Sequence, residues 1–183
     1  MTPIYLIRHG KTEANLRHLY CGSTDLPLSD SGIAALQGLH YALPPVQFIT
    51  SGMKRTEQTL AILFGDMPHE KNPAFREINF GKFEMHSYEQ LKDDPDYIAW
   101  ISGDNQQNVP PGGESGAAMT ARVLAAFQQL QAEHIPTALI THGGVIAAIM
   151  ENLFPDEKKS RYQWQPEPGH GYVIRGTEYS AIP

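Results

Sequence analysis

Residues 3–10 read PIYLIRHG, an apolar run that ends in an arginine and a histidine. The letters IYLI are β-forming residues in one continuous run, which predicts a short buried strand over Pro3–Arg8. Residues 137–144 read TALITHGG, where a predicted strand over Thr137–Thr141 is followed by a histidine and two glycines. Each stretch therefore predicts a strand that carries polar groups directly after its C-terminal end.

Predicted helices alternate with these strands and with another strand over Val46–Thr50. The helices are expected from Ser29 to Pro44-Pro45, over Lys54–Phe64, from Ser115 to before Pro136, and over Gly144–Leu153. Two weaker strand patterns, Tyr172–Arg175 and Glu178–Ile182, follow near the C-terminus. This alternation favours a three-layer α/β/α fold with a mostly parallel central sheet and helices on both of its faces.

The length of 183 residues suits one domain, which we expect to span residues 1–183. Between about residues 81 and 113 the pattern becomes irregular and polar. Two short helix signals interrupt it, Ser87-x-x-Gln90 and Asp94-Pro95. We therefore expect a small helical lid inserted in a single α/β domain.

Composition excludes several classes of protein. The chain has 14 Lys and Arg against 20 Asp and Glu, a net charge of −6 that argues against a nucleic-acid partner. Cys21 is the single cysteine, so an internal disulfide is excluded. No apolar run has the length of a membrane span, and the N-terminal segment lacks a signal-peptide pattern. We expect a cytoplasmic protein without a membrane partner; a homodimer is compatible with the sequence.

Polar residues gather where the predicted strands end. Arg8 and His9 follow the first strand, Arg55 follows the second, and His142 and Gly143 follow the third. Ligands of such sheets bind beyond the carboxyl ends of the strands. Arginine makes bidentate contacts with phosphate, and glycines at a helix N-terminus allow backbone N–H groups to approach an anion. The pattern therefore predicts an oxyanion pocket at this edge of the sheet.

Six motifs in order resemble the phosphoglycerate-mutase-like branch of the histidine phosphatase superfamily. They are RHGKTEAN (8–15), CGSTDLPLSDSG (21–32), SGMKRTEQT (51–59), REINFGKFE (76–84), PPGGES (110–115) and THGG (141–144). Together they extend the resemblance from residue 4 to about 150. Within the family, the segment YCGSTDLPL is most similar to alpha-ribazole-phosphate phosphatases of cobalamin assembly.

The resemblance implies a role for each catalytic residue. His9 is similar to the nucleophile that becomes a phosphohistidine, and Glu77 to the proton donor. Arg8, Arg55 and His142 are similar to the pocket that holds the phosphoryl oxygens. The implied activity is a phosphomonoester hydrolase acting on a small-molecule phosphate ester.

Further phosphate-binding positions are implied by the same motifs. Asn15 resembles an additional phosphate contact, Ser23 and Thr24 lie in a segment that usually lines the pocket, and Gly143 offers its backbone. The sequence also departs from the family. Lys11 stands where Glu or Gln is usual, Phe83 and Met85 stand where Trp and Gly are usual, and Ser51-Gly52-Met53 replaces Ser-Ser-Pro.

Phosphoryl transfer also sets physical requirements for these residues. Charge spreads over three equatorial oxygens in the transition state, and we expect two guanidinium groups and a protonated His142 to compensate it without a metal or other cofactor. His9 must be neutral, with one ring nitrogen donating to a backbone carbonyl. Glu77 must be protonated, and we expect Arg76 to point away from it as its neighbour in a strand.

Two alternatives remain open. One is a phosphoglycerate mutase, which needs extra cations over the pocket for a second anionic group. The segment from Ile78 to Ala121 has two lysines and seven acidic residues, a net charge of −5, which disfavours a mutase. Its aromatic residues favour a flat, uncharged leaving group, although most are expected to form a small core under the lid.

The other alternative is an inactive module that binds a phosphorylated ligand. The presence of the nucleophile, the acid and both arginines disfavours it.

Overall fold

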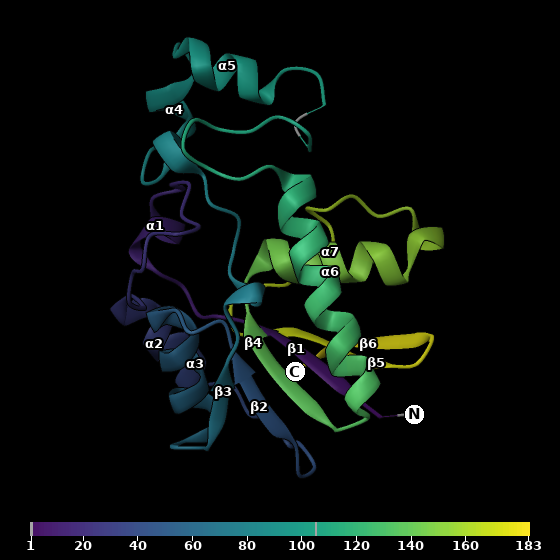
Figure 1. Cartoon of the computed structure of the whole chain (residues 1–183). Coiled ribbons are helices and arrows are strands. Elements are labelled where there is room, and N and C mark those ends of the chain that lie inside the picture. Colours follow the sequence, from purple (N-terminus) through teal and green to yellow (C-terminus); the bar gives the residue numbers. More distant parts are fainter. Residues whose placement is uncertain (1, 105) are drawn as a thin grey trace.

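The computed structural model describes residues 2–104 and 106–183, which form a mixed sheet at the centre of the molecule (Figure 1). In this part of the chain the sheet has six strands in the order β3-β2-β4-β1-β5-β6. The strands are β1 (Ile4–Arg8), β2 (Gln47–Thr50), β3 (His69–Lys71), β4 (Thr137–Thr141), β5 (Gly171–Arg175) and β6 (Glu178–Ile182).

Helices cover both faces of the sheet, which confirms the expected three-layer α/β/α fold. In Figure 1, α2 and α3 lie on one side of the strands, and α6 and α7 on the other. The helices are α1 (Glu13–Leu16), α2 (Asp30–Gln37), α3 (Lys54–Phe64), α4 (Tyr88–Leu91), α5 (Pro95–Ile101), α6 (Gly116–Glu133) and α7 (Gly143–Leu153). Short 3-10 helices are η1 (Pro73–Phe75), η2 (Gly81–Phe83) and η3 (Pro155–Glu157).

The first four strands along the chain, β1 to β4, run parallel to one another, as expected. β1 pairs with β4, β4 with β2, and β2 with β3, all in parallel, whereas β5 and β6 are antiparallel additions. In the pairing of β1 with β4, Arg8 is opposite Thr141. The two strands therefore end at the same edge, and the residues that follow them emerge side by side.

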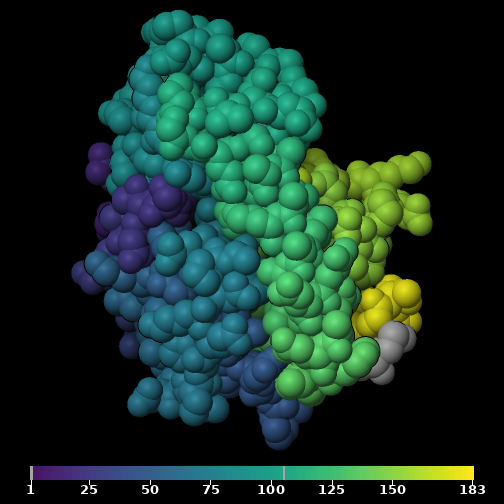
Figure 2. All heavy atoms as spheres, in the orientation of Figure 1, coloured from purple at the N-terminus to yellow at the C-terminus, as the bar shows by residue number. Residues whose placement is uncertain are grey.

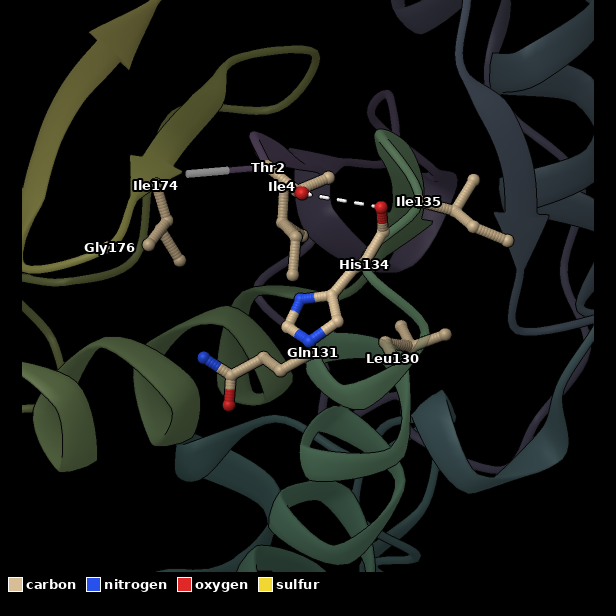
Figure 3. Close-up of a pocket in the computed structure, with 8 residues that line it drawn as sticks. All are labelled: Thr2, Ile4, Leu130, Gln131, His134, Ile135, Ile174 and Gly176. Atoms are coloured by element: carbon tan, nitrogen blue, oxygen red, sulfur yellow. Dashed lines mark hydrogen bonds between the residues drawn. The ribbon is translucent and has the colours of Figure 1, made fainter.

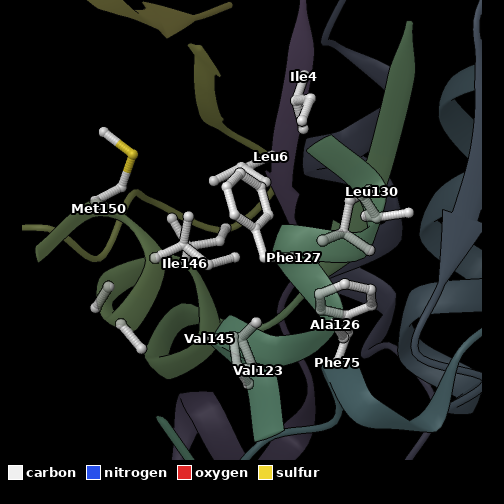
Figure 4. Packing of buried hydrophobic residues seen from close by; sticks show 14 of the residues in the cluster. Ile4, Leu6, Phe75, Val123, Ala126, Phe127, Leu130, Val145, Ile146 and Met150 are labelled. Carbon is white, nitrogen blue, oxygen red and sulfur yellow. The ribbon is translucent and has the colours of Figure 1, made fainter. Parts of the chain in front are cut away.

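Alternate side chains of the strands feed two cores, one on each face. Leu6 and Leu139 join the larger cluster under α6 and α7, whereas Tyr5 and Ala138 join the cluster under α3. Figure 4 shows the larger cluster, with Phe127 of α6 directed toward the strands. Successive residues of a strand point to opposite faces, so continuous apolar runs in β1 and β4 match a sheet buried on both sides.

Two elements differ from the sequence-based expectation. The helix capped by Ser29 ends at Gln37 rather than near Pro44. The N–H groups of Gly38 and Leu39, which follow it, form i→i−3 hydrogen bonds that close the last turn. A glycine in a helix interior costs about 1 kcal/mol relative to alanine, which favours this early end. The strand β3 was not predicted because its residues are all exposed and carry no apolar pattern.

The segment expected to form the lid contains η2, α4 and α5 and lies beyond the end of the sheet where β1 and β4 terminate (Figures 1 and 2). Phe83, Leu91 and Tyr97 form a small core of its own, against which Tyr20 and Trp100 pack. The capping box of Ser87 and Gln90 and the cap of Asp94 are both present. The division into one domain with a lid over about 81–113 stays a prediction. Within the described residues, every helix is too short or too polar to cross a membrane.

Candidate active site

The parallel pairing of β1 with β4 brings the two histidine motifs together. His9 follows β1 and donates its backbone N–H to Thr141 O over 2.9 Å. His142 follows β4, and its ring centroid lies 5.1 Å from that of His9 in an edge-to-face arrangement. The sheet register therefore sets the spacing of the two rings.

His9 has the tautomer that a nucleophile needs. Its Nδ1 lies 2.6 Å from Gly10 O, and a carbonyl can only accept, so Nδ1 carries the proton and Nε2 is left with its lone pair. Burial, followed by the nearby Arg55 guanidinium, holds the pKa of His9 well below its usual range. Gly10 N–H in turn donates to Thr59 Oγ1, which fixes the backbone under the ring. The expected hydrogen bond between His9 and a backbone carbonyl is confirmed.

Arg55, on the first turn of α3, is only 1 % exposed, so its guanidinium needs partners inside the protein. It donates from NH2 to Gly22 O (2.6 Å), from NH1 to Thr24 O (2.9 Å), and from Nε to His142 Nδ1 (3.3 Å). The loop of residues 22–24 therefore holds Arg55 through its carbonyl groups.

His142 is neutral in this arrangement, contrary to the expectation that it is protonated. Burial, followed by the Arg55 charge, holds its pKa well below the usual range. Arg55 Nε is an obligatory donor, so His142 Nδ1 accepts and Nε2 carries the proton. Nε2 donates to Ser51 Oγ over 2.8 Å, and Ser51 Oγ lies 3.1 Å from Thr56 Oγ1. The sequence alone could not show that a neighbouring arginine would face the ring.

Arg8, at the end of β1, lines the cavity of the site and is partly buried. Its NH1 donates to Pro166 O over 2.7 Å. In the described part of the chain, Arg8 Nε is the one buried side-chain nitrogen or oxygen without a hydrogen-bond partner. A Cβ placed on Gly143 would lie 3.1 Å from both Arg8 Nε and Arg8 Cζ, so the glycine leaves room for the guanidinium. A partly buried guanidinium with one unpaired N–H fits the binding of an anion.

Glu77 caps helix α7 from outside the helix. Its Oε2 accepts from Gly144 N–H (2.9 Å) and its Oε1 from Ile78 N–H (3.0 Å). Arg122 of α6 holds the backbone of this segment, donating to Glu77 O and Arg76 O. Glu77 therefore sits in a loop after η1, and the expectation of a strand at residues 76–77 is wrong. Arg76 donates its Nε to Ser51 O.

A cavity of about 400 Å³ unites part of the predicted site. Of the residues predicted from sequence, Arg8, His9, Asn15, Glu77 and Gly143 line it. Arg55 and His142 are not in its wall but contact one another behind His9. Further lining residues that sequence reasoning missed are Arg161, Tyr162 and Gln165. They belong to the C-terminal segment, where the only available signal was an Arg-Tyr pair in a loop.

The remaining predicted phosphate contacts have structural partners. Asn15 Oδ1 accepts from Thr12 N–H (2.9 Å) as part of a capping box. The side-chain NH2 group of Asn15 takes no part in this cap. Ser23 Oγ donates to Asn79 Oδ1, and Thr24 Oγ1 donates to Glu84 Oε2 over 2.7 Å. Neither Ser23 nor Thr24 lines the cavity, and their direct contact with phosphate stays a prediction.

The lid contributes two aromatic rings to the cavity. Phe80 and Trp100 line it, whereas Phe83 and Tyr97 are 0 % and 2 % exposed in the small core of the lid. The expectation that most lid aromatics form a core is therefore confirmed for these two. Met85, which stands where the family usually has glycine, has a φ of 62°, in the left-handed region that favours glycine.

A second cavity, of about 260 Å³, lies at the opposite end of the sheet, between the start of β1 and the end of α6 (Figure 3). Its wall is mainly apolar, with Ile4, Leu130 and Ile174, and Thr2 Oγ1 donates across its edge to His134 O. It contains none of the predicted site residues. In the described residues, no three His, Cys, Asp or Glu side chains are grouped to hold a metal ion.

Comparison with known proteins places the chain among phosphatases and mutases. A model of the histidine phosphatase superfamily (branch 1) matches residues 4–180. The chain is 31% identical over 175 residues to the adenosylcobalamin/alpha-ribazole phosphatase of Salmonella typhimurium, covering 91% of this chain and 86% of that protein. It is 28% identical over 176 residues to the 2,3-bisphosphoglycerate-dependent phosphoglycerate mutase of Xanthobacter autotrophicus, covering 84% and 83%. A crystal structure described as a candidate alpha-ribazole-5'-P phosphatase from Escherichia coli matches with a TM-score of 0.84 at 26% identity, covering 98% of this chain and 94% of that chain.

Proposed function

Because this chain belongs to the histidine phosphatase superfamily and is a phosphatase, we propose that it hydrolyses a small monophosphate of the alpha-ribazole 5'-phosphate type. One observation carries the proposal: a single cavity is lined both by Arg8 and His9 and by the aromatic side chains Tyr20, Phe80, Trp100 and Tyr162. Among its lining residues, His9 is 6 % exposed and Tyr162 is 84 % exposed.

The chemistry that we propose has two steps. First, His9 Nε2 attacks phosphorus, a P–N bond forms, and the P–O bond to the leaving group breaks. Glu77 gives its proton to the departing oxygen, so the product leaves as an alcohol. Second, water attacks the phosphohistidine while the Glu77 carboxylate takes a proton from that water. The P–N bond breaks, inorganic phosphate leaves, and His9 returns to its neutral form.

The contacts of Glu77 suit both steps. Its two oxygens each accept one backbone N–H, which fixes the carboxyl group without using all of its lone pairs. After the alcohol leaves, the same fixed group accepts the proton of water.

Charge compensation comes from the two arginines in this proposal. Arg8 offers its unpartnered Nε to the phosphoryl oxygens. Arg55 has N–H groups beyond the three hydrogen bonds that it makes with Gly22, Thr24 and His142. His142 supports Arg55 as a neutral acceptor, and the N-terminus of α7 adds its partial positive charge.

The leaving group would lie against the aromatic end of the cavity. Phe80 and Trp100 come from the lid side, and Tyr162 from the segment before β5. Flat rings stack on such side chains, and an exposed tyrosine offers a face for stacking at low entropic cost. A nucleoside-like alcohol with an uncharged base therefore suits this end of the cavity.

A phosphoglycerate mutase remains the second candidate, because one feature of the cavity favours it. Arg161 lines the wall and lies outside the segment whose charge argued against a mutase. However, its guanidinium pairs with Glu151 (3.1 Å) and bonds Thr120 Oγ1, so it is partly neutralised. The two lysines of the lid are likewise paired, Lys82 with Asp94 and Asp96, and Lys92 with Glu89. The hydrolase is therefore the better supported assignment.

The deciding experiment measures kcat/KM under one condition for alpha-ribazole 5'-phosphate, a simple aryl phosphate, 3-phosphoglycerate and 2,3-bisphosphoglycerate. We expect the neutral, ring-bearing ester to be the best substrate. Tyr162→Ala should raise KM for alpha-ribazole 5'-phosphate by about tenfold, as the loss of one stacking contact implies, and change the aryl phosphate less. Tyr88→Ala, at another exposed tyrosine that does not line the cavity, is the matched control. Primer-dependent conversion of 3- to 2-phosphoglycerate would instead establish the mutase.

We also propose that the enzyme acts in the cytoplasm and without nucleic-acid or membrane partners. Support comes from the net charge of −6 and from the absence of a membrane-spanning helix among the described residues. A homodimer stays a prediction that sedimentation equilibrium would test.

A further inference from the structure

The carboxylate of Glu84, at the C-cap of η2, accepts hydrogen bonds from the backbone N–H groups of the loop of residues 22–24. Its Oε1 accepts from Ser23 N–H (2.9 Å) and its Oε2 from Thr24 N–H (3.2 Å), while Gly22 N–H lies 3.1 Å from both oxygens. Thr24 Oγ1 donates to the same group over 2.7 Å, and Phe80 N–H over 3.0 Å. Burial opposes ionisation, but hydrogen bonds from the Thr24 hydroxyl and from the backbone hold the pKa of Glu84 below its usual range.

The opposite side of the same loop faces Arg55. The carbonyl groups of Gly22 and Thr24 accept from the Arg55 guanidinium, while the N–H groups of these two residues point to Glu84. The peptide plane between Gly22 and Ser23 carries both the Gly22 O that accepts from Arg55 and the Ser23 N–H that donates to Glu84, so anchoring that N–H sets where the Gly22 carbonyl points. Gly22 is closely enclosed, since a Cβ on it would lie 1.6 Å from Ile78 O.

We propose that Glu84 is a positioning residue for phosphoryl transfer, which anchors the 22–24 loop so that its carbonyl groups hold Arg55 in the phosphate pocket. The inference rests on the proposed role of Arg55 as a phosphate ligand. The proposed positioning role does not require Glu84 to contact the substrate, and Glu84 does not line the cavity.

The same contact ties the lid to the pocket. Glu84 belongs to the segment expected to form the lid, and its neighbours continue the connection. Met85 N–H donates to Tyr20 O (2.7 Å), and Tyr20 N–H donates to His86 O (3.0 Å). Ser23 Oγ also reaches Asn79 Oδ1. A displacement of this part of the lid would therefore act on Arg55 through the 22–24 loop.

Glu84→Gln is the primary test, because an amide keeps the size of the side chain but replaces one acceptor oxygen with an NH2 donor. That group would face backbone N–H donors, and an unsatisfied buried donor is costly. We expect kcat/KM for p-nitrophenyl phosphate, and the affinity for inorganic phosphate, to fall about tenfold or more. The control is Glu89→Gln, at a lid carboxylate whose side chain is 72% exposed and pairs with Lys92.

A double-mutant cycle with Arg55→Lys separates positioning from general structural support. If Glu84 acts through Arg55, adding Glu84→Gln to Arg55→Lys should cost much less than the tenfold loss seen in the parent. An equal loss in both backgrounds would overturn the proposal. Should Glu84→Gln fail to fold, Glu84→Asp, which keeps the charge on a shorter side chain, serves in the same cycle under the same criterion.

The two proposals fail in different ways. Turnover of p-nitrophenyl phosphate does not depend on the natural leaving group, so this cycle is independent of the alpha-ribazole assignment. If Arg55→Lys alone left phosphate affinity and kcat/KM unchanged, the proposed role of Arg55 would be rejected, and the role of Glu84 with it. Additivity despite an essential Arg55 would reject the positioning role alone.

Discussion

Gly144 and Glu77 are in direct contact: the Gly144 N–H donates to Glu77 Oε2 over 2.9 Å, and a Cβ on Gly144 would lie 2.4 Å from Glu77 Oε1. The backbone of α7 thus places the proposed acid, and it does so only while residue 144 lacks a side chain. Arg122 fixes the other side of the acid by holding Glu77 O. The position of Glu77 is consequently set by two helices that are distant from it in sequence.

Gly144→Ala should therefore impair proton donation. We expect kcat for alkyl phosphates to fall by about 10²-fold, because a misplacement of about 1 Å can have that effect. Aryl phosphates with acidic phenols should lose much less, since such phenolates leave without a proton. The measurement is kcat on both classes, with Glu77→Gln as the reference for complete loss of the acid.

Gly38→Ala provides the control for that substitution. Its Cβ would meet only Ala35 O, at an ordinary 3.5 Å, and its φ of −83° suits any residue. It should leave both substrates unaffected. An equal loss on alkyl and aryl phosphates in Gly144→Ala would contradict a role in leaving-group protonation.

Acid should destabilise the protein through its two buried histidines. His9 and His142 have a folded-state pKa well below the usual range, so they stay neutral in the native protein while the unfolded chain takes up protons below about pH 6.5. The stability that they contribute is complete above about pH 6.5 and is lost as the pH falls below it. The slope is at most about 1.4 kcal/mol per pH unit for each histidine.

Urea unfolding between pH 5 and 8 measures this slope. His142→Asn should reduce it, whereas His134→Gln, at an exposed histidine beside the second cavity, should keep the parent slope. Identical slopes for His142→Asn and the parent would show that His142 is not buried in its neutral form.

Phosphate and vanadate should stabilise the folded protein by binding between the arginines. At about 100 times the Kd, mass action adds about 2.7 kcal/mol, which raises Tm by roughly 5–10 °C for a chain of this size. Vanadate can adopt the five-coordinate geometry of the transition state, so it should bind more tightly than phosphate. Arg55→Ala should abolish both shifts, and Arg175→Ala, at the exposed end of β5, should preserve them. If Arg55→Ala bound vanadate as tightly as the parent protein, the proposal that Arg55 contacts the phosphoryl group would be rejected.

Turnover should persist in excess chelator and require His9. The proposed charge compensation comes from Arg8 and Arg55, and the described residues contain no cluster suited to a metal ion. We expect EDTA to leave kcat/KM unchanged and His9→Ala to reduce turnover to background. A strict requirement for Mg²⁺ would refute the metal-independent mechanism, and full activity of His9→Ala would refute the nucleophile.

Elements with strong local signals were predicted closely. The bounds of α3 and β4 match the expectation, because a continuous apolar run or helical periodicity and a following glycine are properties of the segment itself. Ser29 and Ser115 also cap their helices as expected, each accepting the N–H three residues on. The strand ends then place Arg8 and His9 at one edge, because parallel pairing aligns the ends of β1 and β4.

The sequence by itself determined the three-layer fold and indicated that Arg8, His9, Asn15, Glu77 and Gly143 belong to one site, because these depend on local pattern and on parallel pairing. Only the tertiary structure decided that His142 is neutral, since its pKa depends on burial and on Arg55. The tertiary structure alone also places Tyr162 in the cavity wall and the Glu84 carboxylate against the 22–24 loop. These contacts join segments separated by tens of residues, and no local pattern encodes which distant surface a loop side chain will meet.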